Sequence, residues 1–361
     1  MEFKMKKIGI LNFQYSTHNY GAVLQAAALE HICRQLGHDA RHLDYMAQRK
    51  VTLKGRVGQI LRKMGLKKSP QEDQVFNQVV FEQFRAIFLN RTPRIQAERD
   101  FTDIAKGFDS VIVGSDQVWR PAYAKDTIAF FLGYVPKGID RISYAASFGT
   151  ETWQQTEDTH LTSKVQDELR HFRAISCREE SGVKICKDIF GVDAVHVLDP
   201  LLLVDESFFE KIIAKSSVGK DAKLVYYKLD SSADFQEDLA VVGATLGSDA
   251  VNIYLKDSVV REYREVWDWV ALIRNADTVI TDSFHCICLA LRFGKDVVFC
   301  PNERRGQTRL DSLFKKLNID MEPMTGNLRT PMFKLRKRGD IETILERERV
   351  HSMKFLREAL Q

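Results

Sequence analysis

The sequence contains no apolar run near the roughly 20 residues that a membrane-spanning helix requires, which argues against an integral membrane protein. The first apolar run, Ile8–Leu11, has the length of a strand and lacks a small-residue cleavage site, so we do not expect a signal peptide. The six cysteines form no CxxC pair and no Cys/His spacing of a metal site. They are typical of reduced cysteines in the cytoplasm. We therefore predict a cytoplasmic protein that has no metal site and no cofactor.

An excess of charge of one sign is also missing, because 53 lysine and arginine residues face 49 aspartate and glutamate residues, for a net charge of +4. Nucleic-acid-binding proteins usually carry a stronger basic excess, so no nucleic-acid partner is predicted. Between Arg49 and Gln71, however, acidic residues are absent and eight basic residues occur. This basic segment, residues 49–68 (49–70 with its flanks), has the composition of a helix that lies on anionic lipid at the inner face of the membrane. The same composition is also typical of a solvated surface helix or a disordered loop.

What the sequence does contain is an alternation of strands and helices along almost its whole length. A chain of 361 residues with 44% hydrophobic and 28% charged residues is expected to form about two globular domains. We expect strands at 8–13, 41–44, 110–114, 143–147, 174–177, 223–228, 250–255, 278–281 and 297–300, and helices at 21–36, 76–88, 156–172, 179–190, 234–246, 266–274 and 284–292. This alternation predicts an α/β fold of two Rossmann-like, doubly wound domains. We place these domains at 1–205 and 206–330, and a C-terminal helix that packs back at 331–361.

Ligands of open α/β sheets bind outside the carboxyl ends of the strands, so polar residues that directly follow a strand are candidate site residues. The first such group is the loop 12–20, where Asn19 and Gly21 begin a helix. The N-terminus of that helix favours an anionic group of a substrate. The alternative is a plain helix start that Asn19 caps.

The second and third groups follow the expected strands near residues 113 and 177. In the second group, Ser115 and Trp119 are candidates for substrate binding, with Trp119 stacked on a sugar, and Asp116 for activation of a sugar hydroxyl. The alternative is an aspartate cap beside a core tryptophan. In the third group, Arg178 is suited to hold a phosphate or carboxylate through two parallel hydrogen bonds. The alternative is an ordinary helix start, where acidic residues such as Glu179 and Glu180 are favoured without any function.

The fourth group follows the apolar strand that ends at Thr281. It places Asp282, Ser283 and His285 at the corner between this strand and a helix. A histidine in the first turn of such a helix points toward the crevice, and its ordinary pKa suits proton transfer near neutral pH. We therefore predict that this corner belongs to an active site.

These groups, in this order, resemble the polysaccharide pyruvyl transferase family. Each piece alone is common, whereas the ordered set is specific and spans about residues 6–320. The matching pieces are Asn19–Gln25, Gly114–Trp119, Ser143–Gly149, Arg178–Gly182, Asp199-Pro200, Ala276-Asp277 through Phe293–Lys295, and Arg309-Leu310 with Leu313.

The resemblance implies two Rossmann-like domains that face each other across a cleft, as in GT-B-like enzymes, with the acceptor on the first domain and the donor on the second. It implies transfer of the enolpyruvyl unit of phosphoenolpyruvate onto a sugar, with formation of a pyruvate ketal and release of phosphate. The acceptor in such families is often a lipid-linked saccharide, here a lipid-diphosphate intermediate of capsule or exopolysaccharide synthesis. The basic segment would suit peripheral contact with a membrane that carries such an acceptor.

The resemblance also assigns roles to residues. The family's cleft histidine matches His285. From the chemistry of the corner we expect His285 to act as general acid or base or as proton donor on the phosphate side, and the neighbouring Asp282 to orient it. Some members carry an arginine two positions earlier, where this chain has Ser283. The anionic donor must then be bound by other cations. The candidates are Arg178, Lys228, Arg304, Arg305 and Arg309.

Two other functions fit the same sequence features. One is a GT-B glycosyltransferase that uses a nucleotide sugar, because both chemistries bind phosphate with helix N-termini and basic residues. The other is a non-catalytic protein that binds a glycan. The polar residues retained at the strand ends, Asp116, Arg178, Asp282 and His285, count against this second alternative.

Overall fold

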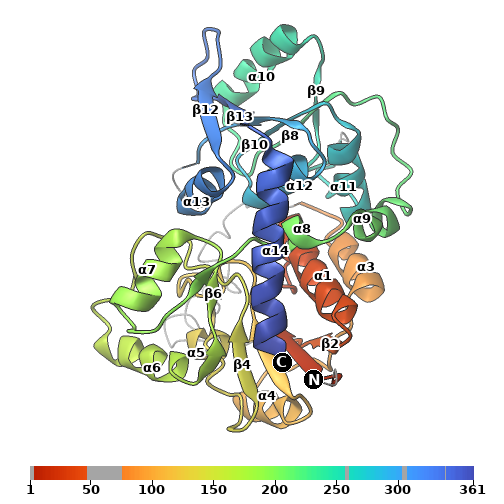
Figure 1. The fold of residues 1–361 in the computed structure, drawn as a ribbon. Helices are drawn as coiled ribbons and strands as arrows, with labels where there is room; N and C mark the ends of the chain where they lie inside the picture. The colour runs from red at the N-terminus through yellow and green to blue at the C-terminus, as the bar shows by residue number, and fades with distance from the viewer. Residues whose placement is uncertain (1–3, 47–74, 257–259, 303–306, 338) are drawn as a thin grey trace, which may run out of the picture.

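The first domain forms a parallel sheet from short apolar runs and is coloured red to green in Figure 1. The computed structural model describes residues 4–46, 75–256, 260–302, 307–337 and 339–361. Five parallel strands pair in the order β2-β1-β3-β4-β5. They are β1 (Lys7–Leu11), β2 (Asp39–His42), β3 (Ser110–Val113), β4 (Asp140–Ser143) and β5 (Phe172–Ala174), and a short parallel pair of β6 (Ser176–Cys177) and β7 (Val195–His196) follows.

The second domain contains a six-stranded sheet in the order β12-β13-β11-β10-β8-β9. Four neighbouring strands of this sheet, β11, β10, β8 and β9, are parallel, and β12 and β13 add an antiparallel hairpin at the edge. The strands are β8 (Leu224–Tyr227), β9 (Ala250–Asn252), β10 (Thr278–Thr281), β11 (Asp296–Phe299), β12 (Ile319–Pro323) and β13 (Phe333–Lys337). The predicted fold class, two Rossmann-like domains that face each other in a GT-B-like arrangement, is therefore confirmed.

Helices cover both sheets. They are α1 (Tyr20–Gln35), α3 (Val79–Phe88), α4 (Glu98–Ala105), α5 (Thr127–Phe130), α6 (Thr159–Leu169), α7 (Glu180–Asp188), α8 (Pro200–Leu203), α9 (Glu206–Ile213), α10 (Ala233–Leu246), α11 (Val266–Asn275), α12 (Phe284–Arg292), α13 (Thr308–Lys316) and α14 (Ile341–Leu360). The longest, α14, runs along both domains (Figure 1). Its Glu348 pairs with Lys316 of α13 at 2.7 Å, and its Ser352 hydroxyl accepts a hydrogen bond from the Leu198 backbone of the first domain at 3.0 Å.

The helix α14 is shorter than the range 331–361 that we assigned to it. Residues 333–337 form β13 instead, which pairs with β11 and β12. The sequence of this run, Phe-Lys-Leu-Arg-Lys, alternates apolar and basic residues, which is the pattern of a half-buried strand. Leu335 is accordingly buried and Arg336 exposed.

The strand expected at 143–147 is wrong beyond its first residue, because β4 already ends at Ser143, where serine side chains replace the backbone pairing. The Ser143 hydroxyl donates to the Ser176 carbonyl and accepts from the Ser176 N–H, at 3.0 and 2.9 Å. The Ser176 hydroxyl in turn accepts from the Ala145 N–H at 3.1 Å. The residues after Ser143 therefore form a buried loop at the carboxyl end of the first sheet, near the candidate site.

The two domains share one hydrophobic core, to which β1 and α1 contribute from the first domain and β8, α11 and α12 from the second. Tyr20, at the start of α1, stacks on Trp269 of α11 with ring centroids 5.1 Å apart. The Tyr20 hydroxyl lies 3.1 Å from the Tyr254 carbonyl and 3.0 Å from the Arg264 carbonyl, and donates to them. The first turn of α1 is therefore fixed to the second domain.

Tyr20→Phe is expected to lower the free energy of unfolding by about 1 kcal/mol, because a shared hydrogen bond across the domain interface is lost while the ring packing is kept. Tyr20→Ala should cost about 3–5 kcal/mol, since the stacked ring is also removed. Urea unfolding at equilibrium measures both values. A Tyr20→Phe variant as stable as the wild type would show that the hydroxyl contributes nothing to the contact between the domains.

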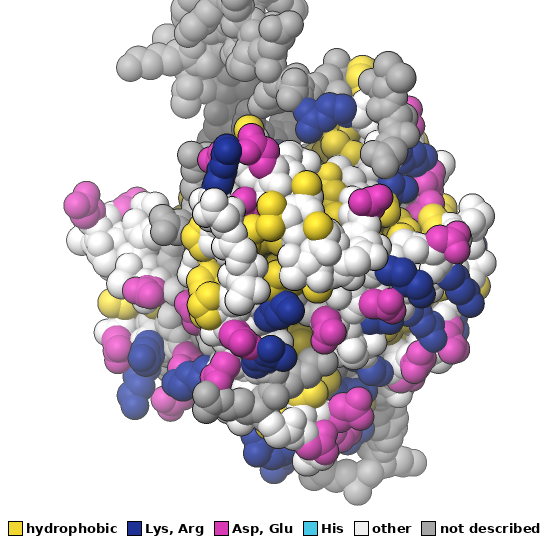
Figure 2. Space-filling view, turned by 90° about the horizontal axis from the view of Figure 1, so that it is seen from above, with side chains coloured by type: hydrophobic (Ala, Val, Ile, Leu, Met, Phe, Trp, Pro, Cys, Tyr) yellow, Lys and Arg dark blue, Asp and Glu magenta, His cyan; other side chains and the backbone are white. Residues whose placement is uncertain are grey.

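The outer face of the second domain carries charges of both signs. In Figure 2, lysine and arginine side chains are interspersed with aspartate and glutamate side chains among the described residues of this face. Ion pairs of the same mixed kind occur within this domain, such as Arg329 with Glu237 at 2.8 Å. The charges that bear on function lie instead between the two domains.

Candidate active site

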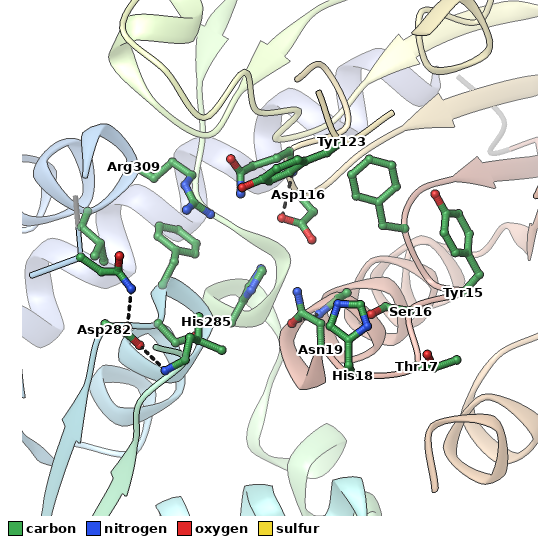
Figure 3. Close-up of a pocket in the computed structure, with 18 of the residues that line it drawn as sticks. Tyr15, Ser16, Thr17, His18, Asn19, Asp116, Tyr123, Asp282, His285 and Arg309 are labelled. Carbon is green, nitrogen blue, oxygen red and sulfur yellow. Dashed lines mark hydrogen bonds between the residues drawn. The ribbon is translucent and has the colours of Figure 1, made fainter. Parts of the chain in front are cut away.

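A cavity of about 600 Å³ lies between the domains, and we call it the central cavity. Its walls come from the carboxyl ends of β1, β3, β10 and β11, as expected for doubly wound sheets. Figure 3 shows Arg309 and Asp282 on one side, Tyr15 to Asn19 on the other, and Asp116 and Tyr123 above them. The corner predicted from the sequence is thus part of the wall of this cavity.

His285 lies in the first turn of α12, lines the central cavity and is only 5% exposed. Its Nε2 atom is 3.0 Å from Nη1 of Arg178 and 3.5 Å from Oδ2 of Asp199. A guanidinium group can only donate hydrogen bonds, so Nε2 is placed to accept one from Arg178. The ring also packs on Gly21 of α1, where an added Cβ would lie 2.1 Å from Nδ1.

Arg178 connects His285 to two carboxylates of the first domain. Its guanidinium is fully buried and lies 2.8 Å from Oδ2 of Asp199 and 3.3 Å from Oδ1 of Asp116. Burial opposes the charged form, but Asp199 and Asp116 outweigh it and raise the pKa of Arg178. The predicted residues Asp116, Arg178 and His285 are therefore brought together in one network.

Asp199 is the member of this network that the sequence did not single out as a site residue. It lies in the loop after β7 as the N-cap of α8, and its side chain also accepts from the Ser115 hydroxyl at 2.9 Å. Burial raises the pKa of such a carboxyl, yet His285 and Arg178 hold the pKa of Asp199 well below its usual range. Asp199 is thus a carboxylate that contacts the candidate histidine from the opposite domain.

Asp116, which belongs to this network through Arg178, also lines the central cavity and is 5% exposed. Burial raises its pKa, but His285 and Arg178 together with Arg309 lower the pKa of Asp116 overall. The side chain is therefore a carboxylate at the cavity wall. It can stabilise positive charge that develops on a substrate.

Asp282 does not orient His285, contrary to the sequence-based expectation. Its carboxylate accepts from Nζ of Lys228 at 2.9 Å, from the Leu229 N–H at 3.0 Å and from Nδ2 of Asn302 at 2.8 Å. Asp282 precedes the N-cap of α12, so its side chain turns toward the end of β8 and not along the helix. It holds together the loops that follow three strands of the second sheet.

The start of α1 was predicted either to bind a substrate or to be an ordinary helix start capped by Asn19, and both features are found there. The Asn19 side chain caps α1 by accepting from the Ala22 N–H at 3.2 Å, and it also lines the central cavity. Gly21 contacts the histidine ring as described above. Ser115 lies deeper than expected, since it is fully buried and bonded to Asp199.

Trp119 belongs to the core of the first domain. Its indole stacks on Phe131 at a centroid distance of 5.1 Å, and its Nε1–H donates to the Phe130 carbonyl at 2.9 Å. The side chain is fully buried, so a stacking contact with a sugar is not open to it in this structure. The tryptophan and its aromatic neighbours instead support the loop that carries Asp116.

Of the basic residues predicted to bind the anionic donor, some line the central cavity and others do not. Arg309 of α13 lines the central cavity, and burial, together with the nearby Arg178, lowers its pKa to about 10. Lys228 pairs with Asp282 and does not line this cavity. Arg304 and Arg305 lie outside the described residues.

Several further side chains of the cavity wall were missed by sequence reasoning. They are Tyr15, His18, Tyr123 and Asn302. Tyr15 and His18 lie in the loop after β1, and Asn302 follows β11, so the strand-end rule alone could have found three of them. Burial and the nearby Asp116 raise the pKa of Tyr15 to about 12.

Within the described ranges, no group of three His, Cys, Asp or Glu side chains is placed to hold a metal ion. No helix in this part of the chain has the length and apolar character needed to cross a bilayer. The basic segment 49–68 falls outside the described residues.

The sequence pattern of polysaccharide pyruvyl transferases matches residues 19–304, a range that contains the network around His285. The chain belongs to the polysaccharide pyruvyl transferase family. No match was found among curated proteins.

Solved structures with a similar fold share little sequence with this family member. The UDP-GlcNAc 2-epimerase of Neisseria meningitidis, bound to UDP-GlcNAc, is 12% identical, with 98% of this chain and 94% of that chain covered and a TM-score of 0.44. A putative UDP-N-acetylglucosamine 2-epimerase of Listeria monocytogenes is 10% identical, with 81% and 78% covered and a TM-score of 0.44. A heptosyltransferase of E. coli with ADP is 10% identical, with 81% of this chain and 86% of that chain covered and a TM-score of 0.37.

Proposed function

We propose that this pyruvyl transferase moves the enolpyruvyl unit of phosphoenolpyruvate onto two hydroxyls of a sugar, forming a pyruvate ketal and releasing phosphate. The observation that carries the proposal is the meeting of a cation, a helix N-terminus and a histidine on one wall of the central cavity. Arg309, the first turn of α12 and His285 form this wall, and the Asp116 carboxylate lines the same cavity.

The donor anion is proposed to bind at the N-terminus of α12. The N-cap residue Ser283 makes no side-chain hydrogen bond to the helix, so the first N–H groups are not capped by it. A helix N-terminus favours phosphate, and Arg309 adds a positive charge on the same wall. This arrangement replaces the arginine that some family members carry where this chain has Ser283.

The reaction requires one proton to reach C3 of the donor and one to reach the departing phosphate, and the two sugar hydroxyls supply both. We assign His285 to proton transfer on the phosphate side, with release from Arg178 as the step that frees Nε2. Asp116 is assigned to the acceptor side. There its carboxylate stabilises the cationic C2 centre and receives a hydroxyl proton.

The acceptor is proposed to be a saccharide linked to a lipid diphosphate, as used in surface polysaccharide synthesis. Aromatic side chains on the acceptor side of the cavity, Tyr15 and Tyr123, support a sugar at this position, because their rings offer apolar faces and hydroxyls. The basic segment 49–68 is proposed to bring the enzyme to the inner face of an anionic membrane.

Incubation of the chain with phosphoenolpyruvate and a panel of lipid-diphosphate saccharides tests the proposal. We expect a mass increase of one pyruvyl group on an acceptor, together with release of phosphate. His285→Ala should abolish both while the variant stays folded. Turnover near the wild-type rate in that variant would contradict the assignment of His285, and thermal stabilisation by UDP-, GDP- or CMP-sugars alone would favour a glycosyltransferase.

A further inference from the structure

We propose that a second pocket, beside the central cavity, binds an uncharged sugar unit of the acceptor. We call it the side pocket. The acceptor then carries at least one sugar beyond the unit that receives the pyruvyl group. The identity of the ligand as an acceptor rests on the proposed function, whereas the binding site itself does not.

The side pocket has a volume of about 420 Å³ and opens at the ends of β8 and β9. These are neighbouring parallel strands, and their carboxyl ends are where doubly wound sheets bind ligands. The volume falls within the roughly 300–1,000 Å³ of small-molecule sites. The pocket is therefore large enough for a sugar unit and lies where the fold favours a ligand.

The side pocket and the central cavity meet at Leu229, which lines both. Lys228 lines the side pocket and Asp282 the central cavity, and the ion pair between them at 2.9 Å forms the wall that separates the two spaces. A ligand that extends from the central cavity past Leu229 therefore enters the side pocket.

The side pocket offers hydroxyl and amide groups of the kind that bind sugar hydroxyls. Tyr226, Tyr254, Gln236 and Ser231 contribute to its lining. Asn252 lines it as well, and its Oδ1 already accepts from two backbone N–H groups, of which the Tyr254 N–H lies at 2.9 Å. The amide nitrogen of Asn252 remains a donor for a ligand.

The charges around the side pocket favour a neutral ligand over a phosphate. The lining contains the cations Lys228 and Arg261 and the anion Asp230, and Lys228 is also paired with Asp282 at 2.9 Å, so cations and carboxylates are equal in number around the pocket. The N-terminus of α10, which borders the pocket, is capped by Ser232 and carries Asp234 in its first turn. An acidic first turn disfavours an anion at this helix end, so a nucleoside diphosphate is a poorer fit than a saccharide.

Binding measurements without the donor test the proposal. The probes are methyl glycosides of glucose, galactose, mannose and their N-acetylated forms, disaccharides built from the same units, and UDP. Gln236→Trp places a bulky ring at the side pocket, and Ala244→Trp, two turns further along α10 on an exposed position, is the matched control. We expect at least one disaccharide to bind the wild type about tenfold more tightly than its monosaccharide units, which corresponds to about 1.4 kcal/mol.

Gln236→Trp should remove this tenfold gain and leave monosaccharide binding unchanged, while Ala244→Trp should behave like the wild type. The proposal is overturned if no disaccharide binds more tightly than its units, or if Gln236→Trp leaves the gain intact. It is equally overturned if Gln236→Trp weakens the binding of UDP, because the side pocket would then hold a nucleoside diphosphate. A chain that binds disaccharides in this way but does not transfer a pyruvyl group would refute the proposed function alone.

Discussion

Asp199→Asn is expected to lower pyruvyl transfer by at least about 100-fold, the scale on which single preorganised electrostatic groups act in catalysis. The substitution keeps the shape of the side chain and its bond to the Leu201 N–H, but removes the charge that faces Arg178 and His285. Because the group is fully buried, loss of one partner should also lower the free energy of unfolding by about 3–5 kcal/mol. Asp199 is thus predicted to position His285. A loss of stability alone would not show this role, because a purely structural residue would also cause it.

Kinetics separate a positioning role from a structural one. The rate of phosphate release should fall to a similar level in Asp199→Asn, His285→Ala and the double variant, because residues that act as one unit are not additive. The matched control is Asp205→Asn, since Asp205 is also a helix N-cap but belongs to α9 and does not line the central cavity. Independent, multiplying losses in the double variant would contradict the assignment.

The stability difference between the wild type and Asp199→Asn should also depend on pH. The folded-state pKa of Asp199 lies below the value of about 3.9 expected in the unfolded chain. The stability that this carboxylate contributes is therefore fully present above pH 5 and is lost as the pH falls below about 4. Urea unfolding of both proteins at pH 7 and at acidic pH measures the change. A difference that grows on acidification would show that the sign is wrong.

Gly21→Ala is expected to lower activity by about 100-fold, because a misplacement of a reacting group by about 1 Å can cost that much. The added Cβ would lie 2.1 Å from Nδ1 and 2.4 Å from Cγ of His285, so the imidazole must move. Gly21 has helical backbone geometry, and alanine favours a helix by up to about 1 kcal/mol over glycine. The loss of activity would therefore arise from the histidine and not from the helix.

Gly219→Ala serves as the control for this substitution. Its Cβ would meet only the side-chain carboxylate of Asp221, at 3.2 Å, so activity and stability should stay close to wild-type values. Circular dichroism and phosphate release together measure both variants. A Gly21→Ala enzyme with full activity would mean that His285 tolerates displacement and is not held for catalysis.

The strand-end rule predicted much of this site because it depends only on where strands stop. Asp116, Arg178 and His285 all follow strands, and the two sheets bring them to one cavity. Side-chain direction is a different matter, because it is set by neighbours that are distant in sequence. Asp282 lines the cavity but bonds to the loop after β8, and Trp119 packs into the core although Gln117, two positions earlier, lines the cavity.

Asp199 shows what sequence reasoning lacked. The residue follows a two-residue strand that apolar patterning does not reveal, and its role depends on a histidine 86 positions later in the other domain. Similarly, the contact of Gly21 with His285 depends on how closely α1 and α12 approach each other. Both facts concern the packing of one domain on the other, which local patterns of residues do not encode.

The core shared by the two domains has a consequence for protein engineering. In an enzyme with two Rossmann-like domains, one domain could be replaced by that of a relative in order to change which sugar the enzyme uses. In this chain, Tyr20 of the first domain stacks on Trp269 of the second, and the face that the second domain presents to α1 is apolar. A chimera joined near residue 206 would bring together two halves of one core that were never matched to each other. A second domain can therefore be exchanged only together with matching core residues on β1 and α1 of the first domain.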